Sequence, residues 1–258
     1  MSELVDLTIA ELRANHDRLA AFVDELGEDQ LKGPSGASEW TIADVLSHLG
    51  SGAEIQQHSI TRALGSEDDV PENQAVWDRW NALPPTEQAG GFVAADERLV
   101  SLFESLTPEQ RSSLTVDLGF LPAPVTVETP LAMRLNEQTL HGWDARVGVD
   151  PEAGLSNAAA ELVLGHYAGA MSFMLGFVGK ADQVAEPVRL AVGSHTIAIG
   201  ESVALETGSD DATATYDGPL EAAVRLVAGR LSPERTPAEV TISGNVSLED
   251  LRRVFPGY

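Results

Sequence analysis

The spacing of apolar residues changes once along this chain, near residue 180, and that change limits the folds open to it. Before this point apolar side chains recur every three to four residues, as at Ile42, Val45 and Leu49, which is the period of an amphipathic helix. After it they alternate with other residues, as at Val188 and Leu190, which is typical of half-buried strands. The chain is therefore expected to combine a helical part with a mixed α+β part.

Several helix starts can be predicted in the first part. Thr8 with Glu11 fits the capping box of a first helix, and Thr41 with Asp44 fits a weaker form of the same box, because Asp replaces the usual Glu or Gln. Ser156 is a suitable N-cap for a last helical run that reaches about residue 179. These starts indicate a bundle of several long helices.

We place the division between the two parts near residue 180. The predicted fold is an N-terminal helical bundle over residues 1–180 and a small α+β domain over residues 181–258. In the second domain a helix over residues 220–231 and a short helix capped by Ser247 accompany the strands.

The composition narrows the function. The chain has 258 residues, and its 40 acidic against 16 basic side chains give a formal charge of −24. Clustered Lys and Arg are needed to bind nucleic acid or an anionic membrane surface, so we expect neither partner. We find no basic start followed by an apolar run and no apolar window long enough to span a bilayer, so the expected compartment is the cytoplasm.

The chain contains no cysteine. This excludes a disulfide, a thiolate metal site and a cysteine nucleophile together. Any thiol chemistry would need a thiol from outside the protein. The composition leaves the oligomeric state open, as a monomer or a homodimer.

One predicted helix carries the main candidate site. It begins at Thr129 and Pro130, since Thr is a good N-cap and Pro is favoured at the first helical position, and it ends at Gly148. Residues four apart lie one above the other on a helix, so Glu137 and His141 share one face. A carboxylate and an imidazole side by side can bind a metal or transfer protons.

Two ligands hold a metal poorly, and in helical bundles further ligands come from other helices. The best third candidate is His48, which lies among apolar residues of the helix that begins near Thr41; a buried histidine there needs a hydrogen-bond partner or a metal. His58 is kept as a replacement ligand. The alternative is structural, with Glu137 and His141 as a surface pair and His48 as a core histidine.

The chain resembles a known family at several short motifs taken together. They are Trp40-Thr41, Asp44-Val45, His48-Leu49, Glu137, His141 and Trp143-Asp144, followed by Gly229-Arg230. In this order they resemble the mycothiol-dependent maleylpyruvate isomerases, which are relatives of the DinB-like metal-binding four-helix bundles. The family's second domain resembles sterol carrier proteins, and a helix in that domain ends in a Gly-Arg pair.

The resemblance implies that His48, Glu137 and His141 bind zinc or another divalent metal, and that Arg230 reaches toward an anionic substrate. Two imidazoles and one carboxylate leave a fourth zinc position open, as in catalytic sites. A low-molecular-weight thiol such as mycothiol can take that position as the reactive thiolate. Arg230 also lies near a helix C-terminus, where the helix dipole favours it whatever its function.

These implications give the expected function. A bound thiolate attacks an electrophilic small molecule, as in the cis-trans isomerisation of a maleylpyruvate-type diacid. One alternative is a mycothiol S-transferase in detoxification or biosynthesis, and another is a non-enzymatic protein that binds an apolar ligand. Asp44 is interpreted as a cap, whereas Asp144 either orients His141 or is paired structurally, and Trp77 and Trp80 either pack or line the pocket.

Overall fold

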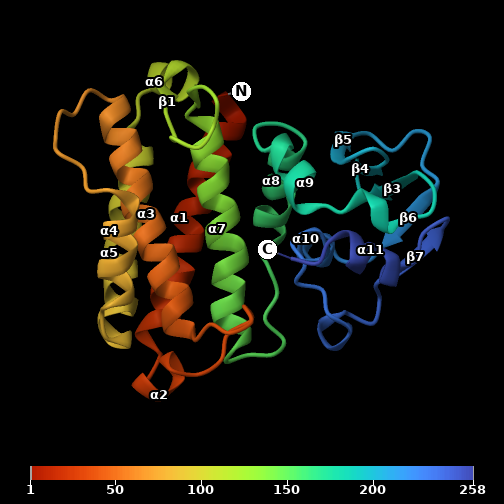
Figure 1. Cartoon of the computed structure of the whole chain (residues 1–258), viewed down its shortest axis with the longest axis horizontal. Helices are drawn as coiled ribbons and strands as arrows, with labels where there is room; N and C mark the ends of the chain where they lie inside the picture. Colours follow the sequence, from red (N-terminus) through yellow and green to blue (C-terminus); the bar gives the residue numbers. More distant parts are fainter. Residues whose placement is uncertain (1, 258) are drawn as a thin grey trace. The chain divides into compact units, whose positions relative to one another are not determined.

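The computed structural model describes residues 2–257 (Figure 1). The chain forms two compact units, of which the first ends at Ala153 and the second begins at Gly154. The division predicted from the sequence lies later, near residue 180. Two helices that the prediction assigned to the bundle, α8 (Asn157–Tyr167) and α9 (Ser172–Val178), are grouped with the sheet.

The first unit is a four-helix bundle, with its helices side by side in Figure 1. Its long helices are α1 (Ser2–Asp24), α3 (Ile42–Ala63), α5 (Pro85–Ser105) and α7 (Glu128–Val147). Both α1 and α3 pack against α5 and α7, so the contacts close into a ring around one core. The connections contain α2 (Glu28–Leu31), α4 (Asn73–Asn81), α6 (Pro108–Ser113), β1 (Thr115–Val116) and β2 (Val125–Thr126).

Large apolar side chains fill the bundle. Leu46 and Leu49 of α3, Phe92 and Leu99 of α5, and Leu135 of α7 are fully buried. Burial of each such side chain stabilises the fold by about 1.5–3 kcal/mol. This interior fixes the rotation of α3 and α7 about their axes, and with it the direction of the side chains on their neighbouring faces.

The start of α3 is the capping box predicted from the sequence. The Asp44 backbone N–H donates to Thr41 Oγ1 over 3.1 Å, and the Thr41 N–H donates to Asp44 Oδ2 over 2.9 Å. The interpretation of Asp44 as a cap is confirmed. The start predicted at Thr8 is wrong, because α1 begins at Ser2 and the Thr8 hydroxyl donates to Leu4 O inside the helix. Val5, which is buried, extends the apolar stripe of α1 before Thr8.

A close contact fixes α4 on α3. A Cβ atom at Gly50 would lie 2.2 Å from the indole of Trp80, so only glycine allows this approach. Trp80 is 3% exposed and packs, whereas Trp77 on the same helix is 42% exposed. The two tryptophans that the sequence could not separate therefore have different roles.

The second unit contains a five-stranded sheet in the order β5-β4-β3-β6-β7. The strands are β3 (Val188–Val192), β4 (His195–Ile199), β5 (Val203–Thr207), β6 (Ala214–Asp217) and β7 (Thr241–Gly244). Only the pair β3 and β6 is parallel. Its further helices are α10 (Leu220–Val227) and α11 (Leu248–Val254), with short 3-10 turns at Ala181–Gln183 and Pro233–Arg235.

The predicted fold class, a helical bundle followed by a small α+β domain, is confirmed. Val188, Leu190 and Val192 are all buried, as the alternation predicted. The helical run expected from Ser156 to about residue 179 is wrong in one respect, because turns at residues 168–171 divide it into α8 and α9. The strand β6 was not predicted. Among the described residues no single helix is long and apolar enough to cross a membrane.

Candidate metal centre

Side chains from α3 and α7 meet at one point of the bundle. His48 Nε2 lies 2.8 Å from Glu137 Oε2, and His141 Nε2 lies 3.6 Å from the same oxygen. One ligand atom from each of these residues lies within 4.8 Å of the others. The structure thus brings together the three side chains that were predicted as ligands from the sequence.

Local structure explains this convergence. Glu137 and His141 are one turn apart on α7, and α3 packs against α7. His48 follows the fully buried Leu46 and precedes Leu49, and these anchors hold its turn of α3 against the bundle. His48 and Glu137 keep 38% and 32% of their side-chain surface exposed. The group therefore lies at the wall of the bundle, where a ligand can reach it.

Asp144 orients one of the histidines. Its Oδ2 accepts a hydrogen bond from His141 Nδ1 over 2.9 Å, and the Asp144 side chain is fully buried. A carboxylate only accepts hydrogen bonds, so this contact places the proton on Nδ1 and leaves Nε2 as the ligand atom that faces Glu137. Of the two roles considered for Asp144, the contact supports orientation of His141.

Trp40 packs on both histidines. Its ring centroid lies 5.3 Å from that of His48 and 6.1 Å from that of His141, and the latter pair is stacked at 27°. The two imidazoles meet edge to face with centroids 4.6 Å apart. These contacts restrict the rotation of both rings and hold their ligand atoms in place.

The charge of Glu137 is set by its surroundings. Burial alone raises the pKa of the carboxyl, but the hydrogen bond from His48 and the charges of His141, His48 and Arg134 outweigh it and lower the pKa to about 2. The side chain is therefore an anion across the neutral range. An ionised carboxylate is the form that binds a divalent cation.

The donor set fits a divalent metal. Zinc bonds of about 2.0–2.2 Å in a tetrahedral arrangement place ligand atoms about 3.4 Å apart. The distances of 2.8 and 3.6 Å from Glu137 Oε2 lie on either side of this value. Two imidazoles with one carboxylate are a known set for catalytic zinc, and they leave one position for water or substrate.

A cavity of about 530 Å³ opens beside the group. This volume suits a small organic molecule. His48 and Glu137 form part of its wall, and every lining residue belongs to the first unit. The others are Gly52, Ile55, Gln56, Ser59, Asn73, Trp77, Leu118, Gly119, Phe120, Met133 and Arg134. Trp77 thus lines the pocket, one of the two roles considered for it.

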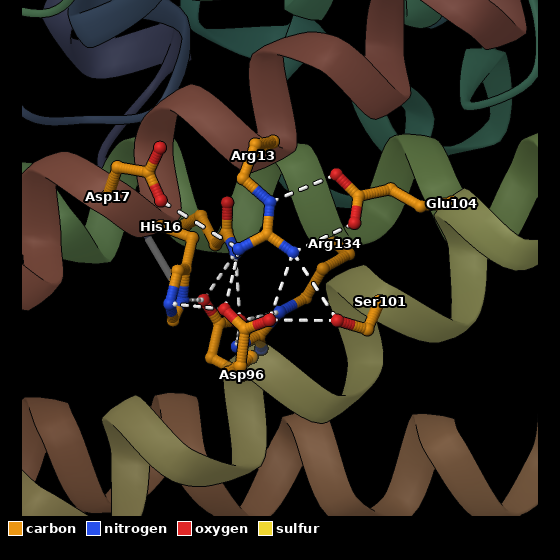
Figure 2. A network of polar contacts seen from close by, with 9 residues as sticks. Arg13, His16, Asp17, Asp96, Ser101, Glu104 and Arg134 are labelled. Atoms are coloured by element: carbon orange, nitrogen blue, oxygen red, sulfur yellow. Dashed lines mark hydrogen bonds and ion pairs between the residues drawn. The ribbon is translucent and has the colours of Figure 1, made fainter.

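A buried polar network next to this cavity was not predicted from the sequence (Figure 2). Asp96 of α5 is fully buried and accepts hydrogen bonds from Arg134, Gln138 and His16. Burial raises the pKa of Asp96, but the charge of Arg134 and these hydrogen bonds outweigh it and leave the pKa below its ordinary value. The sequence did contain one signal of this network, because Asp96 lies within the apolar stripe formed by Phe92 and Leu99.

Arg230 and His58 are the two other residues predicted for the site. Arg230 follows α10 in the second unit and is half-buried, and its Nη1 donates to Ala228 O over 3.0 Å. Its contact with an anionic substrate stays a prediction. His58 lies on α3 with Nδ1 buried and without a hydrogen bond to the described residues. It does not belong to the group formed by His48 and the two α7 residues.

The fold and site define a two-unit protein class, with a four-helix bundle that carries a His-Glu-His group and a small α+β unit after it. Within it, residues 12–146 match the family model described as the mycothiol maleylpyruvate isomerase N-terminal domain. The match covers more than half of the chain, so the chain belongs to this family.

The chain is also similar to individual proteins and solved structures. Two uncharacterised proteins of Mycobacterium tuberculosis, from strains CDC 1551 and H37Rv, are each 28% identical over 171 residues, which cover 62% of this chain and 80% of theirs. Crystal structures of the mycothiol-dependent maleylpyruvate isomerase and of its histidine-to-alanine mutant superpose with TM-scores of 0.63 and 0.64, at 17% identity and over 94% of both chains. At this identity the structures establish the fold alone, over 94% of the chain.

Proposed function

We propose that this protein is a metal-dependent enzyme that uses mycothiol to isomerise a small, anionic cis-enone acid of the maleylpyruvate type in the cytoplasm. The observation that carries the proposal is the convergence of His48, Glu137 and His141 beside a cavity of about 530 Å³, to whose wall His48 and Glu137 contribute. The family to which the chain belongs supports mycothiol as the thiol.

Each residue of the group has a defined part. His48 and His141 would each offer an imidazole nitrogen, and Glu137 would offer a negative oxygen, so the three would hold zinc or another divalent metal with one position open. A metal held by these residues would favour the thiolate form of a nearby thiol, which is the form able to add to a conjugated double bond and leave again. Since the chain has no cysteine, the thiol comes from solution.

The remaining residues prepare the site. Asp144 fixes the tautomer of His141, and Trp40 packs on both imidazoles. Ile55, Trp77 and Phe120 give the cavity an apolar wall against which the carbon chain of an organic substrate can pack. Asp144 and Trp40 therefore position the ligands, and the apolar residues shape the cavity beside them.

An S-transferase would use the same residues and differ only in the fate of the thiol. A thiol balance separates the two. Zinc-loaded, full-length protein is incubated with mycothiol and maleylpyruvate, and the trans product and free thiol are followed together. Isomerase activity gives product without thiol loss. Loss of one thiol for each molecule converted would favour the transferase, and no reaction under these conditions would contradict the proposed substrate.

A further inference from the structure

Arg134 lies on α7 one turn before Glu137 and is 2% exposed. Its Nε and Nη2 both donate to Asp96 Oδ1, over 3.1 and 2.5 Å. Figure 2 shows the guanidinium of Arg134 directed at this carboxylate. One edge of the guanidinium is therefore fully occupied, and the plane of the group is fixed.

Asp96 is itself held from other sides. Gln138 Nε2 lies 2.8 Å from both of its carboxylate oxygens, and His16 Nδ1 lies 2.8 Å from Oδ2. These contacts come from α7 and α1, so the carboxylate cannot turn without breaking hydrogen bonds to two helices. Asp96 thus acts as a rigid support that sets the orientation of Arg134.

The second terminal nitrogen of Arg134, Nη1, takes no part in the contact with Asp96. Nη1 has no hydrogen bond to any residue from 2 to 257. It lies 3.7 Å from the position that a Cβ atom would take at Gly52, and both Arg134 and Gly52 line the cavity. The absence of a side chain at Gly52 leaves the N–H groups of Nη1 open to the cavity.

A guanidinium nitrogen at a cavity wall needs an acceptor, because donors removed from bulk water are costly when unpaired. Among the described residues that line the cavity, Glu137 is the only acidic one, and it already contacts His48 and His141. A negatively charged group of a ligand would therefore be the hydrogen-bond acceptor that Arg134 Nη1 needs.

We infer that Arg134 binds a carboxylate of the ligand in this cavity and selects an acid over a neutral ligand of the same shape. The carbon chain of the ligand packs on Trp77, Ile55 and Phe120, and Nη1 donates to a carboxylate oxygen. This deepens the proposed function, on which it rests, since it assigns the substrate's negative charge to a residue of the bundle. Arg134 is a binding residue here and Asp96 is its positioning residue.

The test compares two probes of one shape, cinnamate and its neutral amide cinnamamide, by isothermal titration calorimetry on the full-length protein. A charge-assisted hydrogen bond predicts that cinnamate binds about tenfold or more tightly than cinnamamide. The titration is made after chelator treatment and again with zinc. Equal affinities, or a preference that appears only with zinc, would overturn the inference and assign the anion to the metal.

Two variants test whether the preference for cinnamate over cinnamamide comes from Arg134. Arg134→Gln combined with Asp96→Asn removes the guanidinium without leaving a buried charge, and the preference for cinnamate should disappear. If this variant does not fold, Gly52→Leu gives the same answer, because its side chain would cover Nη1 from the cavity side. Gly90→Leu is the control, since Gly90 lies on α5 outside the cavity and a Cβ atom there would meet no other atom within 4 Å.

The two proposals fail separately. A cinnamate preference that survives in both Arg134 and Gly52 variants would make Arg134 a structural residue, whatever the metal content. A protein that binds no metal would contradict the proposed function and leave the cinnamate test unchanged.

Discussion

Glu137 and Asp96 are carboxylates of the same bundle, and each contacts at least one histidine, but they differ in burial and in their other partners. Asp96 is fully buried, and Arg134, Gln138 and His16 all donate to it. Glu137 is 32% exposed beside a cavity, with imidazoles as its near partners. A carboxylate whose lone pairs are all occupied is a structural support, whereas a partly exposed carboxylate beside two imidazoles can bind a cation.

The comparison predicts that Asp96 contributes to the stability of the fold and not to metal binding. Asp96→Ala should lower the free energy of unfolding by about 3–5 kcal/mol, because it leaves Arg134 buried without its counter-charge. Urea unfolding measures this loss. The folded fraction should still bind metal in full, and a loss of metal at unchanged stability would reverse the roles of the two carboxylates.

Asp144 tests the metal-binding side of the comparison, because it orients His141 beside Glu137. Asp144→Asn keeps the size of the side chain but removes the charge that orients His141. Metal affinity should fall about 10- to 100-fold. Competition with a fluorescent zinc chelator gives the two dissociation constants. Equal constants would show that Asp144 has no influence on the ligand.

Acid sensitivity tests the contribution of Asp96 to stability. Because the pKa of Asp96 in the folded protein lies below its ordinary value of 3.8, its contribution is complete above that value and is lost as pH falls below it. The loss amounts to at most about 1.4 kcal/mol per pH unit. Urea unfolding from about pH 5 to about pH 3 should show a shallower decline in Asp96→Asn than in the wild type. Parallel declines would contradict this assignment.

The smallest effect is expected at the start of α3. Thr41→Ala removes the cap that accepts from the Asp44 N–H and should cost about 1 kcal/mol of unfolding free energy. Metal affinity should change little, since Leu46 and Leu49 still anchor the turn that carries His48. A large loss of metal in this variant would show that the cap itself positions the ligand.

The sequence predicted much of the metal group because its signal is local. The i,i+4 spacing of Glu137 and His141 follows from helix geometry, and the end of α7 at Gly148 agrees with the prediction. His48 came from its place on an apolar face together with the family resemblance. The sequence could not show that the three atoms meet, since the distance between α3 and α7 depends on the packing of the whole bundle.

The buried network could not be predicted because it is built from distant residues. Asp96 and Arg134 are 38 positions apart, and nothing in either segment identifies the other as its partner. The same limit explains Thr8, because α1 begins at Ser2 and the turn before Thr8 buries Val5 in the core. Local capping patterns predict helix starts only where tertiary packing does not extend the helix.

The central claim is that His48, Glu137 and His141 hold a metal. Metal content of the purified, untagged protein by inductively coupled plasma mass spectrometry tests it most directly, with His141→Ala as the variant and His58→Ala on α3 as the control. We expect about one divalent metal per chain in the wild type and the control, and none in His141→Ala at unchanged helix content. No metal in the wild type after zinc is added and the excess removed, or full metal in His141→Ala, would contradict the claim.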